Sequence, residues 1–160
     1  MRKDRLNRKA NNKNIIAMNK ILSIKKYVVA LVVPLFTVGH VWAFDFSALS
    51  PSGHRLYYTI VSDVAPRTVK VVAPADDRYY YGVTWDGYTK PTGNVVVPDT
   101  VTYGQNTYTV IGLKNKCFKE CDGIVNISLP ATIDSIGENA FYYCTALTSI
   151  VIPNSVKAIG

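Results

Sequence analysis

The sequence predicts a mainly-β protein in which a β-rich N-terminal cap leads into a repeat solenoid with short helical or 3-10 turns. Residues 113–160 carry one residue pattern twice at a shift of 23 residues, and a fixed period in this range is typical of a solenoid. Residues 44–112 are rich in β-branched and aromatic residues between turn signals, which indicates strands. Residues 1–43 have the order of an export signal. These ranges are the three expected parts of the chain.

The first 43 residues predict export. Three lysines between positions 20 and 26 precede an apolar run of 16 residues, Tyr27 to Trp42, and Val41-Trp42-Ala43 provides small residues for a cleavage site. We therefore expect a signal peptide that is cleaved after Ala43, so that the mature chain begins at Phe44. The alternative is a membrane anchor, but the run is short against the roughly 20 residues needed to span a bilayer. Met18 is a second candidate start, because the residues before it are polar and basic.

The positive charge of the chain, +7 in total, belongs to the leader. Residues 1–43 hold nine Lys/Arg and one Asp, whereas residues 44–160 hold nine Lys/Arg and ten Asp/Glu. A nucleic-acid site needs clustered positive charge on the folded part, and only Lys114, Lys116 and Lys119 cluster there. We interpret these three lysines as a solvated edge. The sequence therefore disfavours nucleic-acid binding.

Five strands are predicted in the N-terminal cap. They are His54–Val61, Thr68–Ala73, Gly93–Val97, Val101–Tyr103 and Thr107–Ile111. Turn-forming residues separate them, and the chain from Tyr103 to Tyr108 looks like a hairpin tip. The stretch Val97-Pro98-Asp99-Thr100-Val101 echoes Ile152-Pro153-Asn154-Ser155-Val156. We therefore interpret residues 94–112 as a degenerate repeat with an inserted hairpin, which shields the first core face of the array.

Eight pairs of residues align at the 23-residue shift, among them Phe118 with Phe141 and Cys121 with Cys144. One copy cannot bury its own apolar face, whereas stacked copies form a continuous core. The expected core residues of the repeats are Leu113, Phe118, Cys121, Ile124, Ile127, Leu129, Ile136, Phe141, Cys144, Leu147, Ile150, Ile152, Val156 and Ile159.

The second copy shows how one repeat is expected to fold. Ile150–Ile152 is a short predicted strand, which Pro153 ends because proline has no N–H to donate. Residues 138–144 are predicted to form a short helical or 3-10 turn that fills the coil with Phe141. Gly160 is expected to allow a tight corner.

Residues 136–160, with the sequence IGENAFYYCTALTSIVIPNSVKAIG, resemble the BspA-like leucine-rich repeats of bacterial surface proteins. The family pattern is Ile-Gly, then Ala-Phe, Cys, Leu, Ile and Ile-Pro at set spacings. Residues 113–135 depart from this pattern at Lys114 and Cys117, so we expect a distorted first copy. Residues 44–60 resemble the lead-in that commonly precedes such repeats. The resemblance implies a secreted solenoid that binds a ligand, and it does not imply catalysis.

No catalytic residue, cofactor or metal site is predicted. His54 is the one histidine after the leader, and we interpret it as an exposed residue at the start of a strand. Motifs for phosphate, dinucleotide and zinc binding are absent from the sequence. Asp76, Asp77 and Asp86 lack the spacing of a calcium loop and are interpreted as turn residues. The sequence therefore favours a non-enzyme without a cofactor.

Cys121 and Cys144 occupy the same repeat position, so their Cα atoms are expected roughly 4.8 Å apart in a stacked ladder. That separation permits a disulfide, but equivalent side chains point in parallel, which suits stacked thiols better. Cys117 has no partner at its own position. We expect Cys121 and Cys144 to be buried free thiols that act as small hydrophobic groups.

Aromatic residues are the candidates for ligand contact. They are Tyr79, Tyr80, Tyr81, Trp85 and Tyr88, five rings within ten residues. One interpretation is a stacking platform for sugars or a contact patch for protein. The other is a β hairpin whose alternate residues face the core. Tyr142 and Tyr143 lie on the outer turn of the second copy, where we expect one of the two rings to be exposed.

The sequence supports an exported protein of the extracellular space or cell surface, for which the membrane is only an export route. Its expected role is a binding or adhesion module for a host or neighbouring-cell protein. One alternative is a carbohydrate-binding surface protein, and another is the non-catalytic N-terminal part of a larger exported enzyme. A third copy opens at Ile159, so we expect a truncated array whose uncovered last strand is a candidate site of self-association.

Overall fold

The computed structural model describes residues 43–75 and 84–160. All the described residues belong to one compact unit. Apart from Ala43, the predicted signal peptide lies outside the described residues, as do Asp76, Asp77 and Tyr79–Tyr81. Within the described residues, no helix is long and apolar enough to cross a membrane.

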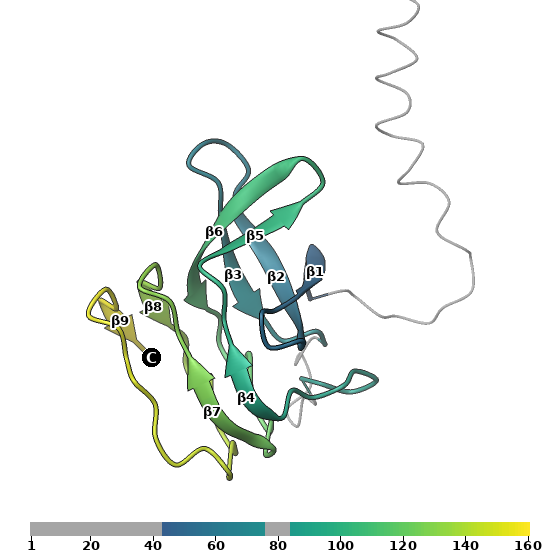
Figure 1. The fold of residues 1–160 in the computed structure, drawn as a ribbon, viewed down its shortest axis with the longest axis vertical. Coiled ribbons are helices and arrows are strands. Elements are labelled where there is room, and N and C mark those ends of the chain that lie inside the picture. Colours follow the sequence, from purple (N-terminus) through teal and green to yellow (C-terminus); the bar gives the residue numbers. More distant parts are fainter. Residues whose placement is uncertain (1–42, 76–83) are drawn as a thin grey trace, which may run out of the picture. The chain divides into compact units, whose positions relative to one another are not determined.

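The described part consists of strands joined by turns (Figure 1). The strands are β1 (Phe46–Leu49), β2 (Arg55–Ser62), β3 (Thr68–Val72), β4 (Gly93–Val96), β5 (Thr100–Tyr103), β6 (Asn106–Leu113), β7 (Ile124–Ser128), β8 (Ser135–Ile136) and β9 (Ala158–Ile159). The five strands predicted before residue 113 are confirmed as β2 to β6. The sequence does not predict β1, because its residues, FSAL, include no β-branched side chain.

The larger sheet has the strand order β1-β2-β3-β6-β8-β9, with β5 paired to β6. Strands β1, β2 and β3 are antiparallel neighbours, whereas β3, β6, β8 and β9 lie parallel, side by side, in Figure 1. Strands β4 and β7 form a separate parallel pair. Parallel neighbours need a connection that returns the chain to the same end, and the coils between these strands provide it.

Residues 23 positions apart pair with one another in the larger sheet. Leu113 lies opposite Ile136, and Ile136 lies opposite Ile159. The same column continues into the N-terminal region, where Val71 of β3 lies opposite Leu113. Because successive side chains of a strand point to opposite faces, these residues share one face. Val71, Leu113 and Ile136 are buried there.

Strand β4 pairs with β7 at a longer spacing. Val95 lies opposite Ile127, a separation of 32 residues, which is nine more than the repeat. The additional residues are accommodated by the β5–β6 hairpin. Gly104 at its tip has a φ of 61°, a left-handed conformation that glycine adopts without strain. The hairpin predicted at residues 103–108 is therefore found, and the interpretation of residues 94–112 as a degenerate repeat stays a prediction.

The turns of the repeats are not helical, and the prediction for residues 138–144 is wrong in this respect. The turn is closed by bonds between residues three apart, such as the Cys144 N–H to the Phe141 carbonyl at 3.1 Å. A right-handed helix needs consecutive residues at negative φ, and left-handed residues interrupt it twice in each copy. They are Lys116 and Glu120 in the first copy and Asn139 and Tyr143 in the second, with φ between 54° and 60°.

The first copy is as regular as the second, so the expected distortion is not found. The Cys121 N–H donates to the Phe118 carbonyl at 3.1 Å, which is the same turn bond that Cys144 makes. Cys117 is completely buried in the position where the second copy has Ala140. The extra sulfur therefore fits the core without a change in the turn.

Gly137 is required by a close approach between coils. A Cβ built at this position would lie 2.4 Å from the backbone nitrogen of Asn115 and 2.6 Å from the carbonyl carbon of Lys114. The φ of Gly137 lies outside the left-handed region, so conformational freedom is not the reason for glycine here. The expected tight corner at the equivalent Gly160 is likewise a close approach, to the backbone nitrogen of Glu138 at 2.8 Å.

A column of three aromatic rings passes through the core. Phe118 stacks on Phe141 with ring centroids 5.8 Å apart, and Trp85 stacks on Phe118 at 6.5 Å. Trp85 begins a turn of the same kind, because the Tyr88 N–H donates to its carbonyl at 3.0 Å. Gly87 has a φ of 76° at the position that Glu120 occupies in the first copy. The N-terminal region thus contributes a repeat-like turn that the sequence pattern did not reveal.

Most of the expected core residues form one cluster that continues into the N-terminal region. Ile152 and Ile159 are exceptions, because both are exposed. The predicted strand at Ile150–Ile152 is also not found. These residues belong to the last copy, which among the described residues has a neighbouring coil on one side only. A segment with a single neighbour has half of the ladder partners that hold a central strand.

Candidate binding surface

A groove of about 540 Å³ lies on the parallel strands β3, β6 and β8. Its volume is within the roughly 300–1,000 Å³ range of small-ligand sites. The residues that line it are Lys70, Val72, Leu113, Lys114, Asn115, Ser135, Ile136 and Gly137. Leu113 and Ile136 turn their side chains to the core, so Lys70 and Ser135, the residues before Val71 and Ile136, present theirs on the outer face of the sheet.

The Lys70 ammonium group is held in place by a chain of hydrogen bonds. Lys70 Nζ donates to Ser135 Oγ at 2.8 Å, and Ser135 Oγ donates to Asp134 Oδ1 at 2.8 Å. An ammonium group carries three donors, so two remain for a ligand in the groove. Because Asp134 compensates part of the charge and Lys114 adds a second positive charge, the groove favours ligands rich in acceptor oxygens.

Gly112 makes the path of the Lys70 side chain possible. It lies between Lys70 of β3 and Ser135 of β8 in the sheet. A Cβ at Gly112 would approach Lys70 Cε to 3.0 Å and Ser135 Oγ to 2.7 Å. Any other residue would therefore push the lysine away from the serine.

The aromatic cluster predicted for ligand contact is only partly described. Tyr79, Tyr80 and Tyr81 lie outside the described residues. Trp85 is 3% exposed, and its Nε1–H donates to the Cys117 carbonyl at 3.2 Å, so it presents no ring face to solvent. Tyr88 is half-buried, with its ring 5.3 Å from that of Tyr57. Both described rings therefore pack into the fold, although residues 84–88 form a turn and not the β hairpin of the alternative interpretation.

Tyr142 and Tyr143 are a second aromatic feature, and here the sequence-based expectation is wrong. Both rings are exposed, at 49% and 61% of their surface, rather than one of the two. Their centroids are 4.6 Å apart and their planes are nearly perpendicular, at 85°. Tyr143 has a left-handed φ of 59°. This backbone conformation turns its side chain away from the core, which explains why the second ring is exposed as well.

The three thiols are free and buried. Cys144 Sγ donates to the Phe118 carbonyl at 3.1 Å. Burial raises the pKa of the Cys144 thiol to about 11, and it also raises the pKa values of Cys117 and Cys121. Since the thiolate is the reactive form, these cysteines have the properties of core residues.

His54 is half-buried and has a polar partner. Its Nδ1 lies 2.9 Å from Ser52 Oγ, which also accepts the Val96 N–H at 3.0 Å. The pair thus fastens the β1–β2 turn to the free edge of β4. Within the described ranges, no group of three or more His, Cys, Asp and Glu side chains is arranged to hold a metal ion.

Residues 98–160 match the family model described as "BspA type Leucine rich repeat region (6 copies)". They are a BspA-type leucine-rich repeat region. The resemblance noted in residues 136–160 is therefore confirmed. Ser135 and Asp134 belong to this leucine-rich repeat region, whereas Lys70 and Trp85 precede it and still join its groove and its aromatic column.

Several solved structures are similar to this chain. A leucine-rich repeat protein from Bacteroides ovatus is 26% identical with a TM-score of 0.49, over 77% of this chain and 24% of that one. A leucine rich cell surface protein from Faecalibacterium prausnitzii is 22% identical with a TM-score of 0.46, over 72% and 27%. A leucine-rich repeat protein from Bacteroides capillosus is 19% identical with a TM-score of 0.48, over 72% and 88%. This chain spans about a quarter of the first two proteins. None of the curated proteins matches it.

Proposed function

We propose that the protein is a non-enzymatic binding module that holds a protein ligand in the groove beside Lys70. The observation that carries this proposal is the Lys70 ammonium group, which Ser135 fixes at 2.8 Å over a sheet face. A donor on a rigid element that is held before the ligand arrives loses little entropy on binding. Carboxylate side chains and backbone carbonyls of an extended peptide are the acceptors that suit it.

The proposed architecture is a short solenoid with an N-terminal cap. Support comes from the column Val71, Leu113, Ile136 and Ile159, which runs from the N-terminal region through both copies. In this arrangement β3 covers the first core face of the array, which would otherwise be exposed. The groove lies where the cap and the first copy meet, so it depends on both parts.

We further propose that the protein acts outside the cell. The order of basic residues, apolar run and Val41-Trp42-Ala43 in the leader supports this location, and one structurally similar protein is described as a cell surface protein. Secreted material should then begin at Phe44. An intact mass that retains the run from Tyr27 to Trp42 would contradict export by a cleaved signal.

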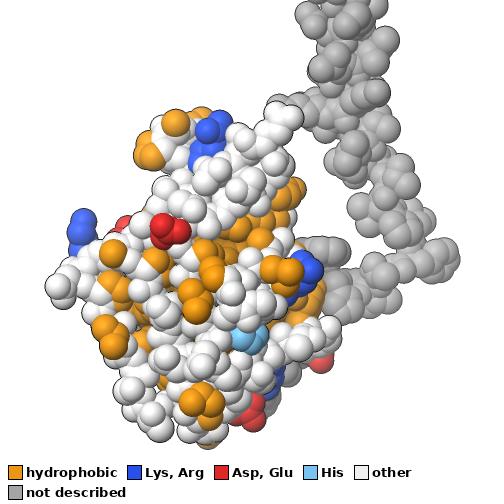
Figure 2. Space-filling view, in the orientation of Figure 1, with side chains coloured by type: hydrophobic (Ala, Val, Ile, Leu, Met, Phe, Trp, Pro, Cys, Tyr) orange, Lys and Arg blue, Asp and Glu red, His pale blue; other side chains and the backbone are white. Residues whose placement is uncertain are grey.

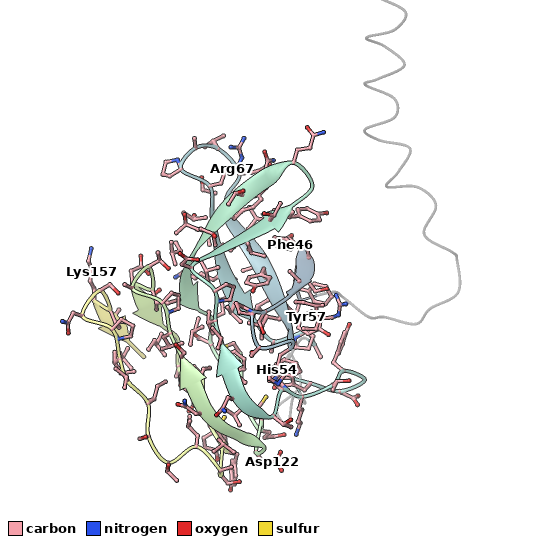
Figure 3. All side chains as sticks on the ribbon, viewed as in Figure 1. Phe46, His54, Tyr57, Arg67, Asp122 and Lys157 are labelled. Atoms are coloured by element: carbon pink, nitrogen blue, oxygen red, sulfur yellow. The ribbon has the colours of Figure 1, made fainter. Side chains whose placement is uncertain are left out.

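Binding is tested with Lys70→Gln, which removes the charge and keeps a donor for Ser135. The protein is applied to immobilised extracellular-matrix proteins and to a glycan array. Lys70→Gln is expected to weaken binding to the protein ligand by about tenfold, since a hydrogen bond to a charged group contributes about 1.5–3 kcal/mol. Lys157→Gln is the matched control, because Lys157 is exposed and lies beside β9, outside the groove (Figure 3).

Two outcomes would overturn this proposal. One is equal binding of the Lys70→Gln and Lys157→Gln proteins to the same ligand. The other is retention on glycans with no response to any protein, which would favour the carbohydrate-binding alternative. That alternative has less support at present, because Trp85 is buried and Tyr88 is half-buried.

A further inference from the structure

The exposed rings of Tyr142 and Tyr143 form a corner on the outer turn of the second copy. Their planes meet at 85°, and their centroids are 4.6 Å apart. About half or more of each side chain faces solvent, at 49% and 61%. Perpendicular rings this close present a ring face and a ring edge to the same small volume. This corner lies away from the groove, whose lining includes neither tyrosine.

The first copy shows that the fold does not need aromatic rings at these positions. The equivalent residues there are Lys119 and Glu120, which form an ion pair at 3.4 Å. The backbone is the same in both copies, with φ values of 60° for Glu120 and 59° for Tyr143. A charged pair and an aromatic pair are thus accommodated equally well by the turn. Packing therefore gives no reason for two exposed rings in the second copy.

One carboxylate acts on the turn that carries the corner, that of Asp122. Asp122 belongs to the adjacent coil, where its carbonyl accepts the Ala146 N–H at 3.2 Å. Burial is the main cause of the raised pKa of Cys144, the residue after Tyr143. The Asp122 carboxylate also raises this pKa and the Lys90 ammonium group lowers it by less, so both charges act on this turn and Asp122 acts more strongly. Asp122 is exposed.

The position of Asp122 can be followed in the figures. It lies just before β7, at the opposite end of the described part from Arg67 (Figure 3). Hydrophobic, acidic and basic side chains lie close together on the surface at that end (Figure 2). The positive charge of Lys119 on the adjacent coil is compensated by Glu120.

We propose that Tyr142, Tyr143 and Asp122 form a second contact site, which takes an arginine or lysine side chain of a partner protein. A cation is attracted to the face of a tyrosine ring, and a planar guanidinium group also stacks on it. The Asp122 carboxylate adds attraction that falls with ionic strength. A neutral sugar would use the ring faces without needing this carboxylate, so the charge of Asp122 favours the cationic partner.

The site is tested with the full chain and a capped peptide that alternates glycine and arginine. Binding is followed by the amide shifts of residues 142–144 in NMR titrations at low and high salt. A peptide with citrulline in place of arginine removes the charge and keeps the shape, and maltohexaose represents a neutral glycan. The arginine peptide is expected to shift these amides, and its affinity should fall as salt is added.

Two variants assign the effect to the corner. Tyr143→Gly removes one ring at a backbone position where glycine is unstrained, as Gly87 shows in the N-terminal turn. It should melt no lower than wild type and bind the arginine peptide about two- to fivefold more weakly. Asn139→Gly makes the same kind of change at a φ of 54° in the same turn and should leave the affinity unchanged. Asp122→Asn should weaken binding at low salt only.

The proposal is overturned if Tyr143→Gly binds the arginine peptide as tightly as wild type, or if Asn139→Gly loses as much affinity. It is also overturned if the citrulline peptide binds equally well or if maltohexaose produces the larger shifts. If Tyr143→Gly melts lower than wild type, the affinity of Asp122→Asn for the arginine peptide tests the site instead, because that variant leaves the backbone and both rings unchanged. Its full affinity at low salt would then contradict the site.

Discussion

The first and last strands of the repeat ladder carry equivalent residues in opposite surroundings. Leu113 is 1% exposed, whereas Ile159, two repeats later, is 64% exposed. Leu113 lies between Val71 and Ile136 in the sheet, and Ile159 has Ile136 on one side only. The same comparison holds for the rings, because Phe118 lies between Trp85 and Phe141, while Phe141 is half-buried. A repeat residue is thus buried by its neighbours and not by its own copy.

The largest expected effect comes from the two phenylalanines. Phe118→Ala should lower the free energy of unfolding by about 3–5 kcal/mol, because it leaves a cavity between two other rings. Phe141→Ala should cost about 1–3 kcal/mol, because less apolar area is removed from the core. Urea denaturation measures both, and Tyr142→Ala is the exposed control. Equal losses for the two phenylalanine variants would show that the copies are buried alike.

The close approach at Gly137 gives the next effect. Gly137→Ala should cost about 1–3 kcal/mol, because its new methyl group meets the backbone of Asn115, which cannot move aside locally. In Gly123→Ala the methyl group meets the side chain of Thr92 instead, and this variant should lose less. Thermal melts of the two proteins test the distinction. A larger loss for Gly123→Ala would contradict it.

The thiols should make the protein less stable in alkali. In the folded protein burial raises the pKa of Cys144 from 9.0 to about 11, so the unfolded chain ionises first. The stabilisation of the folded state by the protonated Cys144 thiol is fully present below about pH 9 and is lost as the pH rises toward 11. The pKa of the more buried Cys121 is raised further, so its contribution should fall over a wider range. Thermal melts between pH 8 and 11 should show that the melting temperature falls less steeply with pH in Cys144→Ala and Cys121→Ala than in wild type. The difference from wild type should be larger for Cys121→Ala.

The smallest effect is expected at the left-handed residues. Lys116→Gly should raise the free energy of unfolding by up to about 1 kcal/mol, because glycine removes the cost of a φ of 59°. Asn139→Gly should change the free energy of unfolding by only about a few tenths of a kcal/mol, since asparagine tolerates the left-handed conformation better than lysine. Urea denaturation compares the two. A stabilisation of Asn139→Gly that exceeds that of Lys116→Gly would contradict the explanation.

The sequence alone determined the ladder of the repeats. Leu113, Ile136 and Ile159 recur at a fixed spacing, and stacked coils of equal length must bring such residues side by side. Strands β2 to β6 were also predictable, because β-branched and aromatic residues dominate them. The β5–β6 hairpin was predictable because the turn-forming residues Gly104, Gln105 and Asn106 stand between two strand patterns.

The tertiary structure decided which residues are covered and what the turns present. Trp85 was expected among the ligand contacts, but it is buried because Phe118 of the next coil stacks on it. A glycine two residues after the ring, Gly87, was the signal that could have identified this turn. The turns were not recognised as left-handed, because glutamate and tyrosine stand where glycine would mark them. The groove depends on Lys70 and Ser135, which are 65 residues apart. No local pattern joins such a pair, because only the register of the folded sheet brings the two side chains together.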